Sequence, residues 1–76
     1  MNDLIEKVNQ WFFDRDLAEG DGLGQIKKLK EEVQELEDAH AANDFAEETD
    51  AVGDITVVLI GYCLQRGLDF EQCLES

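Results

Sequence analysis

No proline occurs at any of the 76 positions of this sequence, and that absence permits long, uninterrupted helices. A proline inside a helix removes a backbone hydrogen bond and clashes with the preceding turn, so only glycines and loop-forming residues remain to interrupt the chain. Because β-branched runs are also few, an all-β sandwich is excluded. We expect one all-α domain over residues 1–76, a bundle of three to four helices.

The spacing of apolar residues predicts where the helices lie. Apolar side chains recur at intervals of three and four residues, as in amphipathic helices. The expected helices are 3–14, 25–41 and 45–66, with a loop over 15–24, a short connection over 42–44 and a fourth helix opening near 69. Asp3 and Asp44 each precede a glutamate by three positions, which is the form of a capping box. Gly67 is a plausible C-terminal stop for the third helix.

The aromatic and apolar residues predict the core and a subunit contact. We expect Trp11, Phe12 and Phe13 to lie in the core, with a wall for base stacking as the alternative. The run ITVVLIGYCL at 55–64 is apolar on every side, so it requires burial within the domain or against a second subunit. A chain this short buries only roughly 60% of the surface that it exposes when unfolded. We therefore expect a homodimer or homotetramer.

The charge balance excludes several partners. The formal net charge is −13, and no Lys or Arg occurs between residues 31 and 65, where ten acids lie. Such a chain repels nucleic-acid phosphates and attracts cations, so no nucleic-acid partner is expected. The longest apolar run is about half a membrane span. With Cys63 and Cys73 interpreted as reduced thiols, we expect a cytoplasmic location, without a membrane partner.

Acidic residues cluster at one edge of the helix predicted over 25–41. Glu31, Glu32 and Glu35 form the pattern E-E-x-x-E, in which Glu32 and Glu35 lie about 60° apart on one face. Both border the apolar stripe of this helix, and Gln25 and Lys28 share that border. The stripe consists of Ile26, Leu29, Val33 and Leu36. This edge should therefore point toward the interior or a cleft.

The next predicted helix carries a second acidic set. Glu47, Asp50 and Asp54 fall within about 60° of one another. If the two helices pack antiparallel, both sets converge, and carboxylate oxygens without histidine or thiolate neighbours favour Mg²⁺ or Mn²⁺. Two solvated acidic faces are the other interpretation, and Lys28 could hold a phosphate or form an i,i+4 ion pair with Glu32. The residues alone leave these alternatives open.

Two segments carry a resemblance to a known family. The sequence QIKKLKEEVQEL at 25–36, followed by EETDAVGD at 47–54 and an apolar run, resembles the MazG-like all-α nucleoside triphosphate pyrophosphohydrolases. The resemblance covers about two thirds of the chain and is strongest to short, single-domain members. It implies hydrolysis of a (deoxy)nucleoside triphosphate to the monophosphate and pyrophosphate, in control of nucleotide pools, with Mg²⁺ as the cofactor.

The resemblance also implies roles for particular residues. The metal ligands would be Glu32, Glu35 and Asp54, and Glu31 would be a further ligand or the base that activates water. The catalytic residues would thus be Glu31 and Glu35. Trp11, Gln25 and Lys28 would contact the base or the phosphates.

The sequence departs from the family pattern at two places. The family's common form has Glu three residues before the final Asp, where this chain has Ala51, and we expect Asp50 to substitute as a ligand, with Glu47-x-x-Asp50 as an alternative pair. Family members also continue into a basic helix, whereas this sequence ends at Ser76. Either the chain is a trimmed or degenerate member, or that helix lies outside these residues. These departures leave a second hypothesis, a non-catalytic acidic helical protein that binds a basic partner or senses nucleotides.

Overall fold

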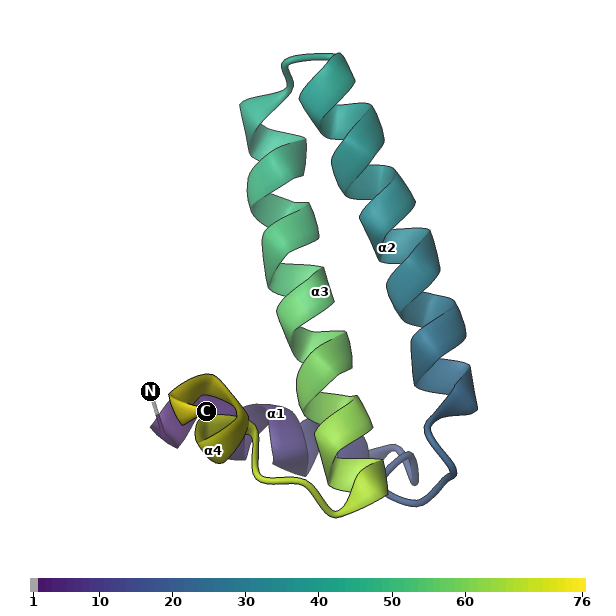
Figure 1. The fold of residues 1–76 in the computed structure, drawn as a ribbon, viewed down its shortest axis with the longest axis vertical. Helices are drawn as coiled ribbons and strands as arrows, with labels where there is room; N and C mark the ends of the chain where they lie inside the picture. Colours follow the sequence, from purple (N-terminus) through teal and green to yellow (C-terminus); the bar gives the residue numbers. More distant parts are fainter. Residues whose placement is uncertain (1) are drawn as a thin grey trace.

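The computed structural model describes residues 2–76 of the chain, which fold into helices without a strand. Figure 1 shows the chain's arrangement, in which α2 and α3 form a long antiparallel hairpin and α1 and α4 lie across its open end. The helices are α1 (Asn2–Asp14), α2 (Leu23–Ala41), α3 (Phe45–Arg66) and α4 (Phe70–Glu75). The all-α prediction and the antiparallel pairing of the two acidic helices are confirmed.

The third helix organises the domain, because α1, α2 and α4 all pack against it. The buried apolar residues come mainly from α3, with one each from α1 and α2. They are Phe12, Ala39, Ala51, Val58, Ile60 and Cys63. The expectation that Trp11 and Phe13 also lie in the core is wrong, since they are 42% and 57% exposed. Successive helical residues point about 100° apart, so only one of three consecutive aromatics can face the core squarely.

Capping residues set the predicted limits of α3. The Asp44 carboxylate accepts a hydrogen bond from the Glu47 N–H at 3.1 Å, and Gly67 follows the last turn with φ at 69°. The α4 helix begins in the same way, with the Asp69 carboxylate accepting from the Gln72 N–H at 3.1 Å. The caps predicted at Asp44, Gly67 and Asp69 are confirmed. They could be predicted because a cap depends on residues within one turn of the chain.

Two predicted helix starts were wrong. The α2 helix begins at Leu23 rather than at residue 25, because Gly22 adopts φ 88° and the Asp21 carboxylate accepts from the Leu23 N–H at 3.0 Å. A left-handed glycine turns the chain directly into the helix, which removes two residues from the predicted loop. The α1 helix already includes Asn2, so that Asp3 lies in its first turn instead of at the N-cap.

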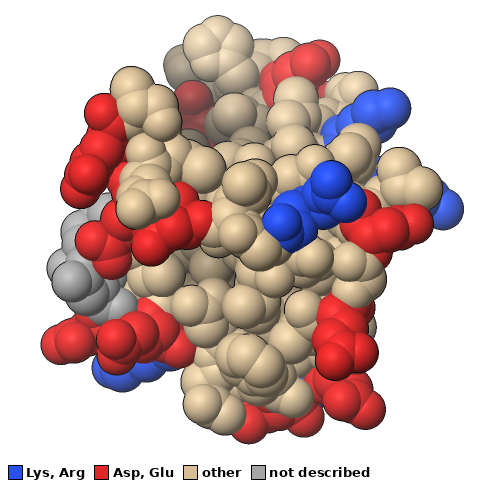
Figure 2. All heavy atoms as spheres, turned by 60° about the horizontal axis from the view of Figure 1, so that its bottom comes forward, with Lys and Arg blue, Asp and Glu red and all other residues tan. Residues whose placement is uncertain are grey.

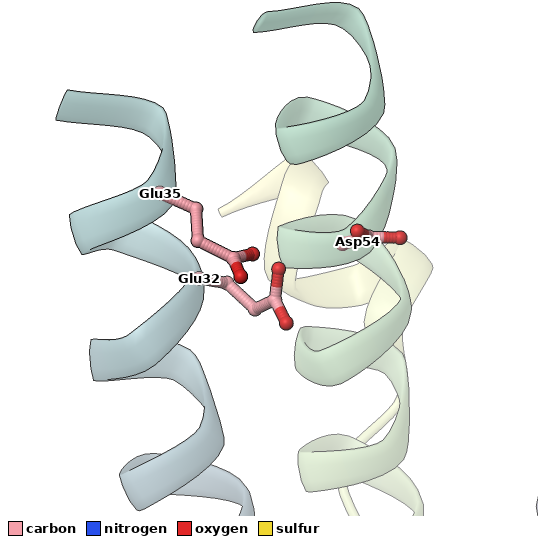
Figure 3. Close-up of side chains that lie close together, drawn as sticks. All are labelled: Glu32, Glu35 and Asp54. Atoms are coloured by element: carbon pink, nitrogen blue, oxygen red, sulfur yellow. The ribbon is translucent and has the colours of Figure 1, made fainter. Parts of the chain in front are cut away.

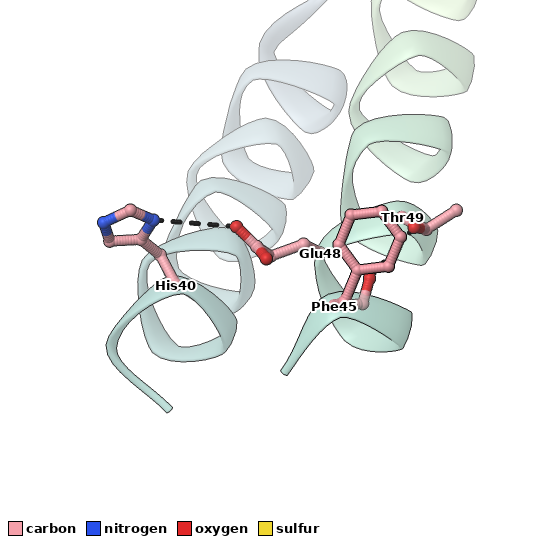
Figure 4. Close-up of polar contacts among 4 residues, drawn as sticks. All are labelled: His40, Phe45, Glu48 and Thr49. Carbon is pink, nitrogen blue, oxygen red and sulfur yellow. Dashed lines mark hydrogen bonds and ion pairs between the residues drawn. The ribbon is translucent and has the colours of Figure 1, made fainter. Parts of the chain in front are cut away.

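The closed end of the hairpin is held by local contacts (Figure 4). His40 on α2 faces Glu48 on α3, with Nδ1 and Oε1 3.6 Å apart, and the Thr49 hydroxyl donates to the Phe45 carbonyl at 2.9 Å. The His40 side chain is 84% exposed, so this contact is a surface one. The connection between the acidic helices is therefore fixed mainly by the Asp44 cap and by backbone hydrogen bonds, such as that from the Asp44 N–H to the Ala39 carbonyl at 2.9 Å.

We expect Asp44→Ala to destabilise the domain by about 1 kcal/mol, because the Glu47 N–H loses its acceptor. Urea unfolding followed by circular dichroism measures the change. Asp38→Ala serves as a control, since it removes an exposed carboxylate that, among the residues the structure describes, accepts only from the Gln34 side chain. Equal stability of the Asp44→Ala variant and the parent chain would contradict the assigned cap.

The burial pattern of α2 differs from its apolar pattern. Its buried residues are Glu32 and Ala39, whereas Ile26 and Val33, which belong to the predicted apolar stripe, are 36% and 38% exposed. On α3, Leu59 is 37% exposed, so the run at 55–64 is not buried on all sides within one chain. The hairpin thus packs with Glu32 inward and leaves apolar side chains on its outer surface.

The end of the molecule opposite the hairpin tip carries further uncharged surface. Figure 2 shows this end with mostly uncharged side chains across the middle of the face, basic atoms among them, and acidic side chains mainly toward the rim. The segments there expose Leu4, Phe13, Leu68 and Leu74. The surplus of negative charge is therefore not spread evenly over the surface.

Candidate metal centre

Three carboxylates meet where α2 crosses the middle of α3. Glu32, Glu35 and Asp54 each offer an oxygen, and these oxygens lie within 4.8 Å of one another. Figure 3 shows Glu32 and Glu35 reaching from adjacent turns of α2 toward α3, which carries Asp54. Their i,i+3 spacing puts the two glutamates on one face, and the antiparallel hairpin brings Asp54 opposite them.

Glu32 is buried although it is charged, with only 4% of its surface exposed. Its Oε1 atom lies 3.1 Å from the Lys28 Nζ, which forms the predicted i,i+4 ion pair. Its Oε2 atom is also buried, and no residue from 2 to 76 donates a hydrogen bond to it. A buried carboxylate oxygen without a donor costs free energy, and a cation is the partner that its charge would favour.

The two glutamates differ in their affinity for protons. When protonated, the Glu35 carboxyl can donate a hydrogen bond to the Glu32 carboxylate, and this bond, together with the negative charge of Glu32, raises the pKa of Glu35 above the ordinary value. The same hydrogen bond lowers the pKa of Glu32, and the ion pair with Lys28 lowers it further against the opposing effect of burial. Glu32 is thus the ionised member, and Glu35 keeps a proton to higher pH.

This arrangement predicts that divalent metal binding depends on pH. Mg²⁺ should bind more weakly below the raised pKa of Glu35, because that carboxyl must lose its proton to become a ligand. Without metal, the free energy of unfolding should fall as pH rises through this pKa, since the folded state holds the proton more tightly.

Calorimetric titration of Mg²⁺ in two buffers of different ionisation enthalpy measures the released proton. Glu35→Gln should abolish that release. Binding by the unmodified chain that is independent of pH and of the buffer would show that Glu35 does not ligate the metal.

A hollow beside the carboxylates gathers the other predicted site residues. It has a volume of about 350 Å³ and extends from α1 across α2 to α3. Its lining includes Trp11, Gln25 and Lys28, together with Glu32 and Asp54. An aromatic ring, an amide and an ammonium group therefore share one hollow with two of the clustered carboxylates.

Asp50 and Glu31 lie outside the group of three carboxylates. Asp50 lines a second hollow of about 480 Å³ toward the hairpin tip, with Glu47 and with Glu35 and Asp54 at its border. Ala51 is 4% exposed, so the position where the family carries Glu faces the interior but offers no ligand atom. Asp50 points about 100° away from that direction. Glu31 is exposed on α2.

The loop after α1 also forms part of the hollow, and no sequence pattern predicts its contribution. Leu17 lines the hollow, and its carbonyl accepts a hydrogen bond from the Gln65 amide at 3.0 Å. The partners lie 48 positions apart, and neither belongs to a periodic pattern that links them. Only the packing of α1 against α3 brings this loop to the site.

Comparison with known families gives this geometry a context. The sequence model of the phosphoribosyl-ATP pyrophosphohydrolase family matches residues 1–76. The chain belongs to this family. The resemblance to all-α nucleotide pyrophosphohydrolases is thereby confirmed.

Pyrophosphohydrolases are hydrolases that act on acid anhydrides, and those of this type act on nucleotides and depend on a metal. Membership therefore favours the enzyme over the non-catalytic alternative. Neither a curated protein nor a solved structure gives a match to this pyrophosphohydrolase. Within residues 2–76, none of its helices is long and apolar enough to cross a membrane.

Proposed function

We propose that this chain is a Mg²⁺-dependent pyrophosphohydrolase that converts a nucleoside or deoxynucleoside triphosphate to the monophosphate and pyrophosphate. The observation that carries the proposal is the buried Glu32 carboxylate, whose Oε2 atom has no donor among residues 2–76 although two more carboxylates lie within 4.8 Å. A divalent cation would satisfy this oxygen and offset the repulsion among the three acids.

The donor set fits Mg²⁺, with Mn²⁺ as a substitute. Glu32, Glu35 and Asp54 offer only hard carboxylate oxygens, which these ions prefer, and water and substrate phosphates would complete the coordination. When bound, the ion would neutralise the triphosphate and polarise the α-phosphate. This charge is needed because the chain itself carries a net −13.

The reaction requires water to attack the α-phosphorus. A bond forms between the water oxygen and that phosphorus, the bond from the phosphorus to the α–β bridging oxygen breaks, and pyrophosphate leaves. We assign Glu35 as the group that accepts the proton of water, because it is the exposed glutamate of the cluster and its pKa is raised. Glu31 stays a further candidate for this role.

The residues of the hollow would bind the rest of the substrate. Lys28 lies 3.1 Å from Glu32 and would move to the phosphates once that carboxylate has another cation. Trp11 lines the same hollow and offers a half-exposed ring for stacking, and the Gln25 amide can donate to and accept from a base.

Two substrate classes fit this site. Ordinary (d)NTPs are the substrates implied by the resemblance of residues 25–36 and 47–54 to the MazG-like family. Phosphoribosyl-ATP is the second candidate, favoured by the family whose sequence model covers residues 1–76. Both contain the same α–β anhydride, so the proposed roles of Glu32, Glu35 and Asp54 do not depend on the choice.

The test is hydrolysis of a substrate panel by the purified chain. The canonical dNTPs and NTPs and phosphoribosyl-ATP are each incubated with Mg²⁺, with Mn²⁺ and with EDTA, and the products are separated by chromatography. We expect a nucleoside monophosphate and pyrophosphate in the metal-containing reactions only. Release of orthophosphate and a diphosphate, or equal turnover in EDTA, would refute the proposal.

We also propose that the chain acts as a homodimer or homotetramer. Val33 on α2 and Val52 and Leu59 on α3 are exposed, and Val33 and Leu36 line a hollow on α2. Burying these side chains against a second copy would complete the core of a small domain. Light scattering after size exclusion should give two or four times 8.6 kDa, and Val33→Glu should reduce the mass to that of one chain.

A further inference from the structure

The position of Trp11 depends on two neighbours on α1 and the loop that follows it. Trp11 is 42% exposed, so packing alone does not immobilise its ring. The Arg15 guanidinium lies over the ring face, with its Cζ atom 4.1 Å from the ring centroid. Phe12 meets the ring edge-on, with a centroid separation of 5.0 Å and an interplanar angle of 78°. One neighbour therefore contacts the face of the ring, and the other fixes its tilt.

Each of these neighbours is itself anchored. An Arg15 terminal nitrogen donates to the Trp11 carbonyl at 3.3 Å, so one side chain contacts both the backbone and the ring of the same residue. Phe12 is 2% exposed and packs directly against Gly61 of α3. A planar cation on an aromatic face is attracted by the negative potential of the ring. The ring is thus clamped between a charged group and the core.

We propose that Arg15 is a positioning residue that holds Trp11 as the stacking wall of the nucleotide hollow. The inference rests on the proposed function, because it assumes that the base enters the hollow lined by Trp11. Arg15 acts through the ring and does not line the hollow with it. Its removal should therefore weaken nucleotide binding while leaving the reacting groups, Glu32 and Glu35, in place.

The experiment uses Trp11 as its own reporter, since it is the one tryptophan in the sequence. Arg15→Met removes the cation but keeps a flexible side chain, Arg15→Lys restores the charge, and Lys30→Met removes a positive charge from the side of α2 opposite Glu32. Emission of each protein is titrated with α,β-methylene-ATP and α,β-methylene-UTP in Mg²⁺, and acrylamide quenching reports the exposure of the ring.

We expect the nucleotide to quench Trp11 emission in the parent chain. Arg15→Met should weaken the binding of the nucleotide analogue by about two- to fivefold, which is the size expected of an exposed cation–π contact, and should make the ring more accessible to acrylamide. KM should rise by the same factor with kcat unchanged, Arg15→Lys should restore part of the loss, and Lys30→Met should match the parent.

Several results would overturn the inference. They are unchanged acrylamide quenching and affinity in Arg15→Met, an equal loss in Lys30→Met, and an absence of nucleotide quenching in the parent chain. If the parent chain releases pyrophosphate but shows no nucleotide quenching, the base binds away from Trp11. The inference about Arg15 then fails, whereas the proposed function holds. Nucleotide quenching without hydrolysis would support the role of Arg15 in positioning Trp11 but would refute the proposed hydrolytic function.

Discussion

Replacing Glu35 with glutamine should lower kcat for Mg²⁺-dependent pyrophosphate release by about 10²- to 10⁴-fold, the range expected when a general base is removed. The amide keeps the shape of the side chain but neither ionises nor accepts a proton from water. Glu35 is exposed at the mouth of the cluster, so its replacement should leave the fold intact. Loss of repulsion toward Glu32 and Asp54 should, if anything, stabilise the metal-free chain.

Glu37→Gln is the matched control for this experiment. Glu37 is exposed on the same helix, and its side chain points about 200° away from Glu35 and lines a different hollow. Its replacement changes the net charge by the same amount and should leave kcat within twofold of the parent. Turnover that survives in Glu35→Gln, or that falls equally in both variants, would remove Glu35 from the catalytic machinery.

Adding a single methyl group at Gly61 should be the most destabilising small change in the core. A Cβ atom there would overlap the Phe12 ring, with the ring Cε1 at 2.6 Å. Phe12 is 2% exposed, so the ring has little room to move aside. Overpacking of this kind costs about 1–3 kcal/mol or more, against a total of about 4–11 kcal/mol for a domain of this size.

Gly53→Ala tests whether the loss at Gly61 comes from the contact or from the helix. Gly53 lies in the same helix with open space around the position of its missing Cβ, so alanine should stabilise the domain by up to about 1 kcal/mol. Urea unfolding of both variants gives the comparison. If Gly61→Ala also gains stability, the close packing of Phe12 on α3 is wrong.

Much of the fold could be predicted because the relevant interactions are local. The Asp44 cap, the stop at Gly67 and the cap at Asp69 each depend on residues within one turn of the chain. The start of α2 could not be placed in this way, since Gly22 adopts a left-handed conformation that a glycine permits but does not require.

Part of the candidate site could also be predicted, because two of its residues lie within one turn of the same helix. The i,i+3 spacing of Glu32 and Glu35, with an antiparallel hairpin, is sufficient to predict that acids of α3 lie opposite them. Spacing could not distinguish Asp50 from Asp54 as the residue that joins the cluster, because both lie on the same side of α3. The burial of Glu32 in place of the apolar Val33 depends on how α2 is rotated against α3, which no periodicity of α2 alone determines.

The location of the metal is the claim on which the rest depends. Crystals grown with Mn²⁺ and α,β-methylene-ATP, measured at a wavelength where manganese scatters anomalously, would locate the ion directly. We predict an anomalous peak in contact with the carboxylates of Glu32, Glu35 and Asp54, and beside the α-phosphate. A peak confined to the hollow lined by Asp44, Glu47 and Asp50, or a nucleotide bound without manganese at the three carboxylates, would contradict it.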